Sequence, residues 1–506
     1  MAQDLETCRN AARRLKKAYA AGTAEAVERV KAHIPADRPP RHADFLHVIA
    51  REAGEASWPQ LKFALDTLTR SRDHRAERLK IALYEGQNWR IARLLEQDPG
   101  LAAHNLGLQI ALYDQPAVEA ALARDPSAAT RVIGVRTPLL HLAFSREIHR
   151  SPEKRAAMMA IAAALVAHGA DVNEGYPAEP GSDHKLSALY GALCHAGNLE
   201  LGRWLLEHGA DPNDNECAYH ATELGQLDTL KLLMRYGVRL SGTNALPRAL
   251  DFRNLEMVRL LLDYGADPNE AVQGHPSGQP VDSIPALHQA ARRWCPGDIA
   301  TLLLDHGADP MAPWNGHTPY ATARIYGNAG IAAVLESRSA ASALTKGEQL
   351  LAACAEGRVL PERIDPALLQ PEDHLLLTRL VFEPHRLEHF KALVAAGLDP
   401  GRADEMGLTP LHSAGWAGLP EAVEFLLTLG PDLDWVNGFG GDALGSVIHG
   451  SEHRLDRHVR DHIGCARLLL EAGAKLPDAY IDGCGDEAMA AFLEGWRDGG
   501  SRTGAG

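Results

Sequence analysis

The stretch that decides the fold reads His-Gly-Ala-Asp-Pro-Asn at residues 208–213. The same phrase returns with a single change at each of residues 168–173, 264–269 and 306–311. A leucine-rich run precedes most copies, as at residues 204–206 and 260–262. Self-similarity of this kind predicts a chain that grows by stacking short modules, each too small to bury its apolar face alone.

A second phrase, Thr-Pro-Leu-His-Ser-Ala at residues 409–414, opens the modules and has degenerate copies at 137–139, 285–288 and 318–320. Thr409 is a helix-capping residue type, and Pro410 suits the first helical position because the N–H it lacks has no partner there. The recurrent glycine, as at Gly430, suits the left-handed residue that ends a helix. Gly397 and Gly430 are 33 residues apart, and the other intervals range from 28 to 43 apart from a gap of 90 between Gly307 and Gly397. The pattern predicts pairs of helices joined by hairpin tips.

The two phrases together resemble the ankyrin-repeat family over about residues 75–490. The resemblance implies an all-α ankyrin-repeat solenoid of helix-turn-helix modules with hairpin-tip loops. It also implies that the histidine of the opening phrase, at His141, His288 and His412, bridges backbone groups of neighbouring repeats.

We expect five regions along the chain. A helical segment that caps the first repeat precedes the array, and its residues 56–62 are similar to helical segments before ankyrin arrays in many bacterial proteins, which indicates a bacterial source. The regions are a helical cap at 1–72, the first part of the array at 75–340, a degenerate repeat at 341–372, the second part with a C-terminal cap at 373–498, and a disordered tail at 499–506.

The composition of the chain restricts the classes of partner and the cellular compartment that we expect. With 51 basic and 66 acidic residues the net charge is −15, which disfavours nucleic acid and anionic membranes and favours a basic protein partner. The seven cysteines are an odd number without a CxxC pair, which indicates free thiols in a reducing compartment. The start of the chain has no signal-peptide pattern, and the apolar run at 156–166 is shorter than the ~20 residues of a membrane span. We therefore expect a cytoplasmic protein.

Catalytic motifs are missing from the sequence, so no enzyme and no cofactor is expected. One cluster stands out: His449, His453, His458 and His462, at intervals of 4, 5 and 4. It is either a solvated polar insertion or a zinc site, with His458 and His462 on one helix face as ligands. The glycine and serine at 450–451 are expected to break any helix between His449 and His453.

Aromatic and histidine side chains on the predicted hairpin tips are candidates for contact with a partner, because such rings dominate interface hot spots. Each ring can equally fold over the neighbouring repeat. The candidates are Tyr176, His275, Trp314, Trp435 and Phe439.

The leading hypothesis is a scaffold that binds a protein partner through a concave face of first helices and hairpin tips. The alternative is a metal-dependent enzyme or small-ligand binder that uses the histidine-rich insertion near 449–462. A third hypothesis, an immunity or antitoxin role, rests only on the acidity and the scaffold class.

Overall fold

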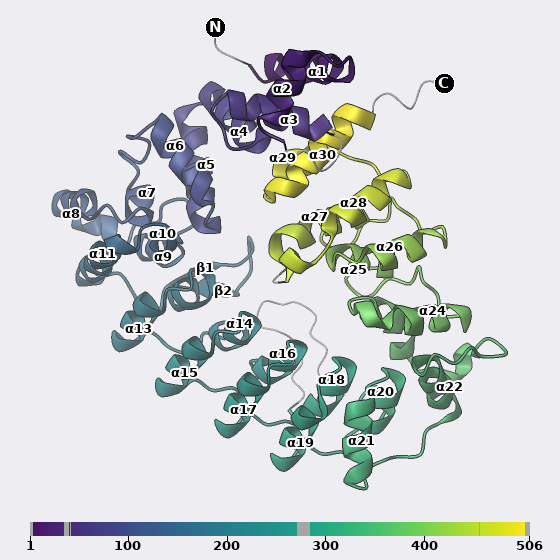
Figure 1. Ribbon diagram of the computed structural model, residues 1–506. Helices are drawn as coiled ribbons and strands as arrows, with labels where there is room; N and C mark the ends of the chain where they lie inside the picture. Colours follow the sequence, from purple (N-terminus) through teal and green to yellow (C-terminus); the bar gives the residue numbers. More distant parts are fainter. Residues whose placement is uncertain (1–3, 35–39, 41, 271–283, 455, 501–506) are drawn as a thin grey trace. The chain divides into compact units, whose positions relative to one another are not determined.

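The computed structural model describes residues 4–34, 40, 42–270, 284–454 and 456–500 (Figure 1). The chain divides into two compact units: a central unit, Arg70–Leu344, and a terminal unit that combines the chain up to Thr69 with the chain from Thr345. Both units are built almost entirely of helices. The predicted all-α architecture of helix pairs is confirmed.

The central unit is a succession of helix pairs. Its elements are α5 (Arg72–Glu85), α6 (Asn88–Gln97), α7 (Leu106–Ala111), α8 (Gln115–Arg124), η1 (Pro126–Ala129), α9 (Pro138–Ala143), α10 (Glu147–Arg150), η2 (Pro152–Lys154), α11 (Arg155–Ala167), β1 (Gly175–Pro177), β2 (Lys185–Ser187), α12 (Ala188–Tyr190), η3 (Gly191–His195), α13 (Leu199–Glu207), α14 (Cys217–Glu223), α15 (Leu227–Arg235), α16 (Ala245–Asp251), α17 (Leu255–Asp263), α18 (Ala286–Arg292), α19 (Gly297–Asp305), α20 (Pro319–Ile325) and α21 (Ala329–Ser337).

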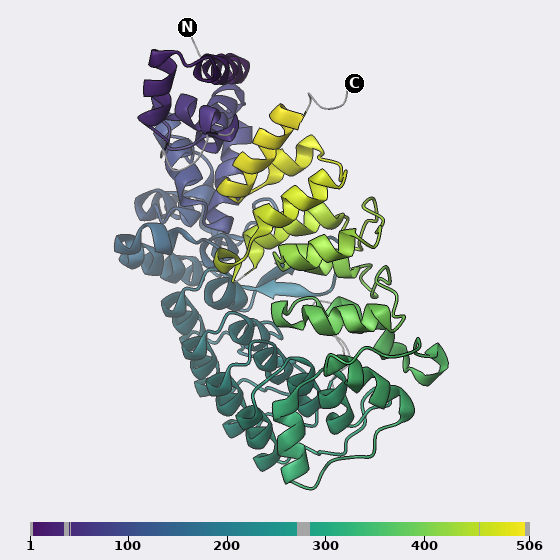
Figure 2. The ribbon, with the colours of Figure 1, turned by 45° about the vertical axis from the view of Figure 1, so that its right-hand side comes forward.

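These helices form two layers within the central unit. First helices α14, α16, α18 and α20 pack on one another in order, and second helices α13, α15, α17, α19 and α21 pack in a second layer (Figures 1 and 2). Leucines of the second helices, such as Leu205 and Leu261, are fully buried between the layers. One continuous apolar core therefore runs through successive repeats, as the period of the sequence requires.

The recurrent phrase supplies both the turn and the connection to the next repeat. Gly209 adopts a φ of +94° at the end of α13, the left-handed region that favours glycine. Asp171 accepts the backbone N–H of Asn173 at 2.9 Å, which closes the hairpin tip. Asn173 then reaches across, donating to the carbonyl of Gly209 (3.1 Å) and accepting from the N–H of Asp211 (2.7 Å). The phrase thus joins consecutive tips by side-chain hydrogen bonds.

The opening phrase begins helices mainly through its proline. Pro410 is the first residue of α25, as predicted. Thr409 precedes it but makes no hydrogen bond to the helix backbone, because its hydroxyl lies 2.8 Å from Nδ1 of His412. The equivalent Thr318 does cap α20, accepting the N–H of Ala321 at 3.2 Å. The threonine hydroxyl therefore either caps the helix or contacts the histidine of the opening phrase.

The terminal unit contains helices from both ends of the chain. Its elements are α1 (Leu5–Ala20), α2 (Ala24–Lys31), α3 (His42–Glu52), α4 (Trp58–Thr69), α22 (Lys346–Ala355), η4 (Pro366–Leu368), η5 (Pro371–Leu375), α23 (Leu376–Leu380), η6 (Pro384–Arg386), α24 (Leu387–Ala395), α25 (Pro410–Trp416), α26 (Pro420–Leu427), α27 (Ala443–His453), η7 (Arg457–Val459), α28 (His462–Glu471), α29 (Asp478–Gly483) and α30 (Glu487–Gly500).

The N-terminal helices of this unit pack on its last helix, a contact that the sequence does not predict. Helices α3 and α4 lie against α30 (Figure 1). Trp58 donates its indole N–H to the buried carboxylate of Glu494, and Lys62 lies 2.8 Å from the same carboxylate. The first ~70 residues and the last helix are thereby held together by a buried ion pair.

The predicted degenerate repeat differs most from a regular helix pair. Within residues 341–372 the only α-helix that the structure describes is α22, followed by irregular chain and 3-10 turns. Among the described residues, no helix is long and apolar enough to cross a membrane.

Candidate functional site

A row of charged side chains crosses three successive first helices of the central unit. Glu216, at the start of α14, is 1% exposed and lies 2.8 Å from Nε2 of His220. His220 Nδ1 lies 2.6 Å from Glu223, which in turn pairs with Arg248 on α16. Arg248 also pairs with Asp251 at 2.8 Å. Positive and negative groups therefore alternate from one repeat to the next.

The row continues onto α18 and beyond. Asp251 lies 2.8 Å from Nε of Arg293 and accepts a hydrogen bond from Gln289. Gln289 accepts a hydrogen bond from Nε of Arg292 at 2.6 Å. The guanidinium of Arg292 lies 5.4 Å from the ring centroid of Trp314, a cation–π distance. Each of these side chains is thus held in place by a contact with the following one in the row.

Charge pairing fixes the protonation states in this row. Burial opposes protonation of His220, but its hydrogen bonds to Glu216 and Glu223 outweigh burial and raise its pKa to about 9. Burial would raise the pKa of Glu223, yet the hydrogen bond from His220 and the charge of Arg248 lower it to about 2. Asp251 has a lowered pKa against the effect of burial because Arg293 and Arg248 face it. At neutral pH His220, Glu223 and Asp251 are therefore charged.

An aromatic cluster adjoins the row on the preceding repeats. The guanidinium of Arg136 lies 4.4, 4.9 and 4.6 Å from the ring centroids of Tyr84, Phe144 and Tyr176. Its Nη2 donates to the hydroxyl of Tyr176 at 2.8 Å. Tyr176 stands on β1, which pairs with β2 in an antiparallel hairpin. The three rings enclose one arginine, an arrangement that fixes all four side chains.

The cluster and the row are contiguous. Tyr190, at the end of α12, lies 6.0 Å from Phe144 and 5.1 Å from His220 between ring centroids. The chain there forms a π-helical turn, η3, a local widening that often marks functional positions. We call the continuous surface the first-helix strip. Its members are Tyr84, Arg136, Tyr176, Tyr190, Tyr219, His220, Glu223, Arg248, Asp251, Phe252 and Arg293.

The predicted tip residues fall into different environments. Trp314 is only 9% exposed and packs beside His288 at 5.7 Å, so this ring folds over its repeat. Trp435 is 45% exposed and donates its indole N–H to the carbonyl of Gly407 at 2.9 Å. Phe439 is 66% exposed. His275 lies outside the described residues.

The histidine-rich insertion does not gather its four rings. His449 and His453 lie one turn apart on α27, which runs unbroken through residues 450–451, so the expected helix break is wrong. Gly450 is needed there because a Cβ at this position would lie 2.2 Å from the carbonyl of Trp416 on the neighbouring α25. His458 and His462 do not share a helix face, since η7 ends at 459 and α28 begins at 462.

The last of these histidines has a structural contact. His462 is 4% exposed, and its Nε2 lies 3.0 Å from the carbonyl of Trp416. His458 is exposed on η7. Within the residues that the structure describes, no three side chains of His, Cys, Asp or Glu come close enough together to hold a metal ion.

The three histidines of the opening phrase contact backbone carbonyls, as the resemblance implies. His288 Nε2 lies 2.8 Å from the carbonyl of Ala312, and His412 Nε2 lies 3.2 Å from that of Trp435, each in the following hairpin. His141 instead contacts Ile133, in the hairpin before its own helix. Burial lowers the pKa of His141 and His288 to about 4, so both are neutral donors.

Of the residues in the first-helix strip, only Tyr176 was predicted from the sequence. A signal was present: polar residues three apart recur on successive first helices, at His220 and Glu223, Arg248 and Asp251, and 289 and 292. Such pairs share one helix face, and their repetition along stacked helices indicates a polar ridge.

Comparison with known proteins agrees with this architecture. Residues 189–272 match the sequence model of ankyrin repeats in three copies, and this range contains η3 through α17 and much of the first-helix strip. No curated protein matches the chain. The matched segment, the left-handed glycines, the asparagine bridges and the stacked helix pairs agree with one another. The match and the structure together show ankyrin repeats at residues 189–272.

Proposed function

We propose that this chain is an interaction scaffold that binds a protein partner through the first-helix strip and the adjoining hairpin tips. Ankyrin repeats generally mediate protein–protein interaction. The strip carries the proposal because it combines tyrosine, phenylalanine and arginine side chains, the residue types enriched at interface hot spots.

The charges of the strip are arranged in advance of binding. The guanidinium of Arg248 lies 5.4 and 5.1 Å from the ring centroids of Tyr219 and Phe252, and it also pairs with the carboxylates of Glu223 and Asp251. Side chains already fixed in the free protein lose little conformational entropy when a partner covers them. The strip therefore presents a rigid pattern of alternating charge and aromatic surface.

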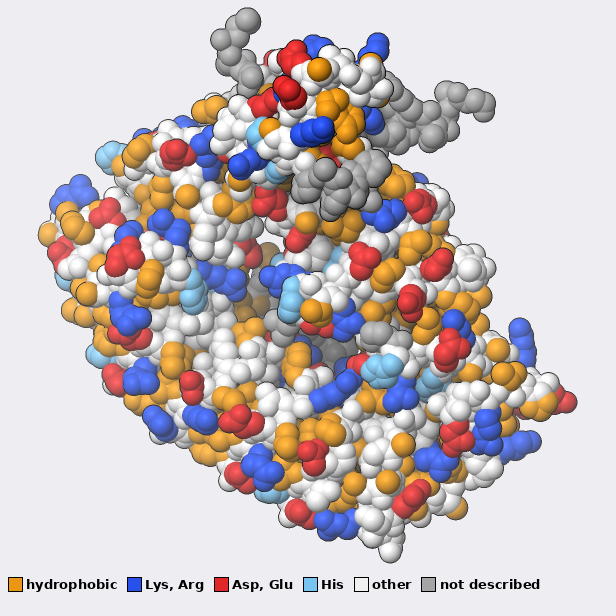
Figure 3. All heavy atoms as spheres, in the orientation of Figure 1, with side chains coloured by type: hydrophobic (Ala, Val, Ile, Leu, Met, Phe, Trp, Pro, Cys, Tyr) orange, Lys and Arg blue, Asp and Glu red, His pale blue; other side chains and the backbone are white. Residues whose placement is uncertain are grey.

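The specificity of partner binding follows from the alternation of positive and negative side chains along the strip. On the face shown in Figure 3, Lys and Arg side chains are interspersed with Asp and Glu side chains, without a continuous field of one sign. The net charge of −15 speeds the approach of a basic partner. Final recognition then depends on matching the order of charges along the strip.

The cysteines support the cytoplasmic location that we propose with this function. All seven lie within the described residues, and all are buried as free thiols. Burial raises the pKa of most of them, for example that of Cys295 to about 12, so they are unreactive side chains of the core.

The test is capture of the partner by two matched variants. Phe252 and Tyr236 are aromatic residues that each follow a helix, and they are 41% and 37% exposed. Phe252 adjoins Arg248 in the strip, whereas Tyr236 follows the second helix α15. We expect Phe252→Ala to weaken capture from the source cell about tenfold and Tyr236→Ala to leave it unchanged. Equal effects of the two changes would exclude the strip as the binding surface.

A further inference from the structure

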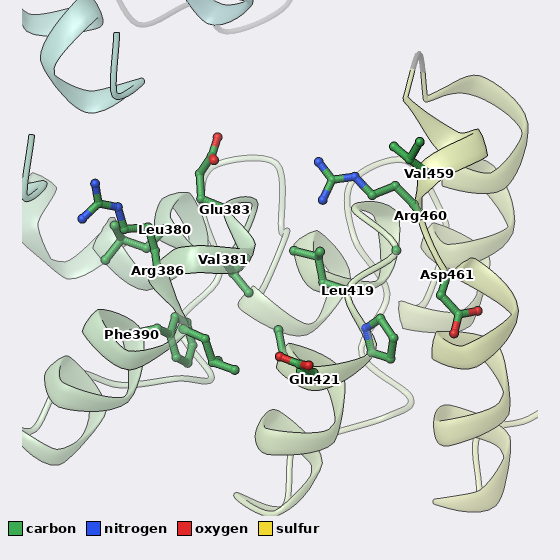
Figure 4. Close-up of a pocket in the computed structure, with 14 residues that line it drawn as sticks. Leu380, Val381, Glu383, Arg386, Phe390, Leu419, Glu421, Val459, Arg460 and Asp461 are labelled. Atoms are coloured by element: carbon green, nitrogen blue, oxygen red, sulfur yellow. The ribbon is translucent and has the colours of Figure 1, made fainter. Parts of the chain in front are cut away.

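A separate hollow of about 310 Å³ opens in the terminal unit (Figure 4). It lies where the turns between first and second helices of successive repeats meet, at the opposite ends of these helices from the hairpin tips. We call it the turn-side pocket. The residues that line it are Leu380, Val381, Glu383, Arg386, Leu387, Phe390, Gly418, Leu419, Pro420, Glu421, Ala422, Val459, Arg460 and Asp461.

The interior of the turn-side pocket is apolar. Leu380 and Phe390 form one side, Leu419 lies near the centre, and Val459 stands on the opposite side (Figure 4). Leu380, Phe390 and Leu419 belong to the core, but Val459 is 70% exposed. An exposed aliphatic side chain facing a hollow with core residues at its base offers contact area to a group from outside.

The insertion that carries Val459 is held by hydrogen bonds to the preceding repeat. The N–H of Asp461 donates to the carbonyl of Gly418 at 3.1 Å, and Nε2 of His462 lies 3.0 Å from the carbonyl of Trp416. Gly418 has a φ of +65°, and a Cβ there would lie 2.8 Å from the Cβ of Arg460. The insertion therefore packs on a glycine that permits its close approach, and the pocket is preformed.

Negative charge prevails at the rim. Carboxylates are contributed by Glu383, Glu421 and Asp461, and guanidinium groups by Arg386 and Arg460. The charge of Arg460 is matched inside the insertion, because Nη2 and Nε lie 2.6 and 2.8 Å from one oxygen of Asp456. Glu421 and Asp461 are both exposed. Among the lining residues three carboxylates face two guanidinium groups, a net charge of −1, and the pairing of Asp456 with Arg454 leaves this balance unchanged.

We propose that the turn-side pocket binds a short basic segment of a protein partner, which inserts one aliphatic side chain between Leu419 and Val459. The volume lies at the lower end of the range for ligand pockets, about 300–1,000 Å³, and suits an anchoring side chain. Lysine or arginine beside that anchor complements the carboxylates of Glu421 and Asp461. The proposal rests on the proposed function only in taking a protein partner, because it uses a different surface.

A phage-displayed library of random dodecapeptides, selected against the full chain, tests this directly. We expect enriched peptides to carry an aliphatic residue flanked by lysine or arginine. Their affinity, measured by fluorescence anisotropy with synthetic copies, should fall about tenfold or more for Val459→Lys. The control is Val359→Lys, which makes the same change at a valine that is 83% exposed and outside the pocket.

A second pair of variants tests the charge. Glu421→Lys should also weaken these peptides, whereas Glu424→Lys, at an exposed position on the same helix α26 outside the pocket, should not. This pair decides the question even if Val459→Lys lowers the melting temperature.

The outcomes separate the two surfaces. Peptides that weaken with Phe252→Ala but not with Val459→Lys or Glu421→Lys would support the first-helix strip and overturn the turn-side pocket. The reverse pattern would support the pocket alone. A selection that yields no peptide sensitive to Val459→Lys or to Glu421→Lys also overturns it.

Discussion

His220 is expected to remain protonated well above the usual range of histidine, and this makes a measurable contribution to stability. Its imidazolium is held between Glu216 and Glu223, 2.8 and 2.6 Å away, and its side chain is 23% exposed. The facing groups from adjacent elements are Tyr190 from α12, His184, which lies 2.9 Å from Glu216, and Arg248 from α16, which pairs with Glu223.

The size and sign of the effect follow from the pKa. The folded-state value of about 9 exceeds the ordinary value of 6.5, so folding favours the protonated ring. At about 1.4 kcal/mol for each pKa unit, the difference corresponds to roughly 3.5 kcal/mol as an upper bound. This contribution is fully present below pH 6.5 and is lost as the pH rises from 6.5 through 9. His220→Gln should remove this dependence.

Two measurements check the prediction. NMR titration of ¹³C-labelled histidine, with the His220 signal identified by its loss in His220→Gln, should give a midpoint near pH 9. Urea unfolding at pH 6 and pH 9 should show a larger drop in midpoint for the wild type than for the variant, a comparison that cancels the other titrating groups. Titration of His220 at or below pH 6.5 would refute the reasoning, because the two carboxylates would then not hold the ring.

Three further predictions concern packing. Leu261→Ala, at a fully buried position of α17, should lower the free energy of unfolding by about 2–5 kcal/mol, and an unchanged urea midpoint would contradict the continuous core. Trp314→Ala should cost about 3–5 kcal/mol, measured in the same way, because the ring is buried beside His288; a loss below about 1 kcal/mol would place the ring at the surface. His462→Ala should lower the melting temperature, whereas His458→Ala should not, and elemental analysis of both should show no change in metal content; bound zinc that is lost in either would restore the metal hypothesis.

The recurrent phrases were sufficient to predict the repeats because their interactions are local. Asp171 closes its own hairpin within two residues, Gly209 ends its own helix, and Pro410 begins one. Each of these depends on backbone geometry over a few positions, so a single sequence contains the information. The helix pairs and the hairpin tips follow from it, whereas the carbonyl contacts of His288 and His412 were implied by the family resemblance.

The functional surfaces could not be predicted in the same way. The first-helix strip joins Arg136 to Tyr176 and Glu223 to Arg248, pairs that are 40 and 25 residues apart, and each pairing depends on how far one repeat is rotated on the next. The turn-side pocket depends on an insertion folding back over Gly418, which the histidine spacing did not indicate.

By itself, then, the sequence determined the module: which residues turn, which end a helix and which enter the core. The tertiary structure alone decided which charged groups meet, that Trp314 is buried, and that Trp58 reaches Glu494 across 436 residues of chain. The physical reason is that turns and caps are satisfied within one module. The partners of a charged or aromatic side chain on the surface of a module are instead supplied by other modules, whose position is set only when the whole array packs.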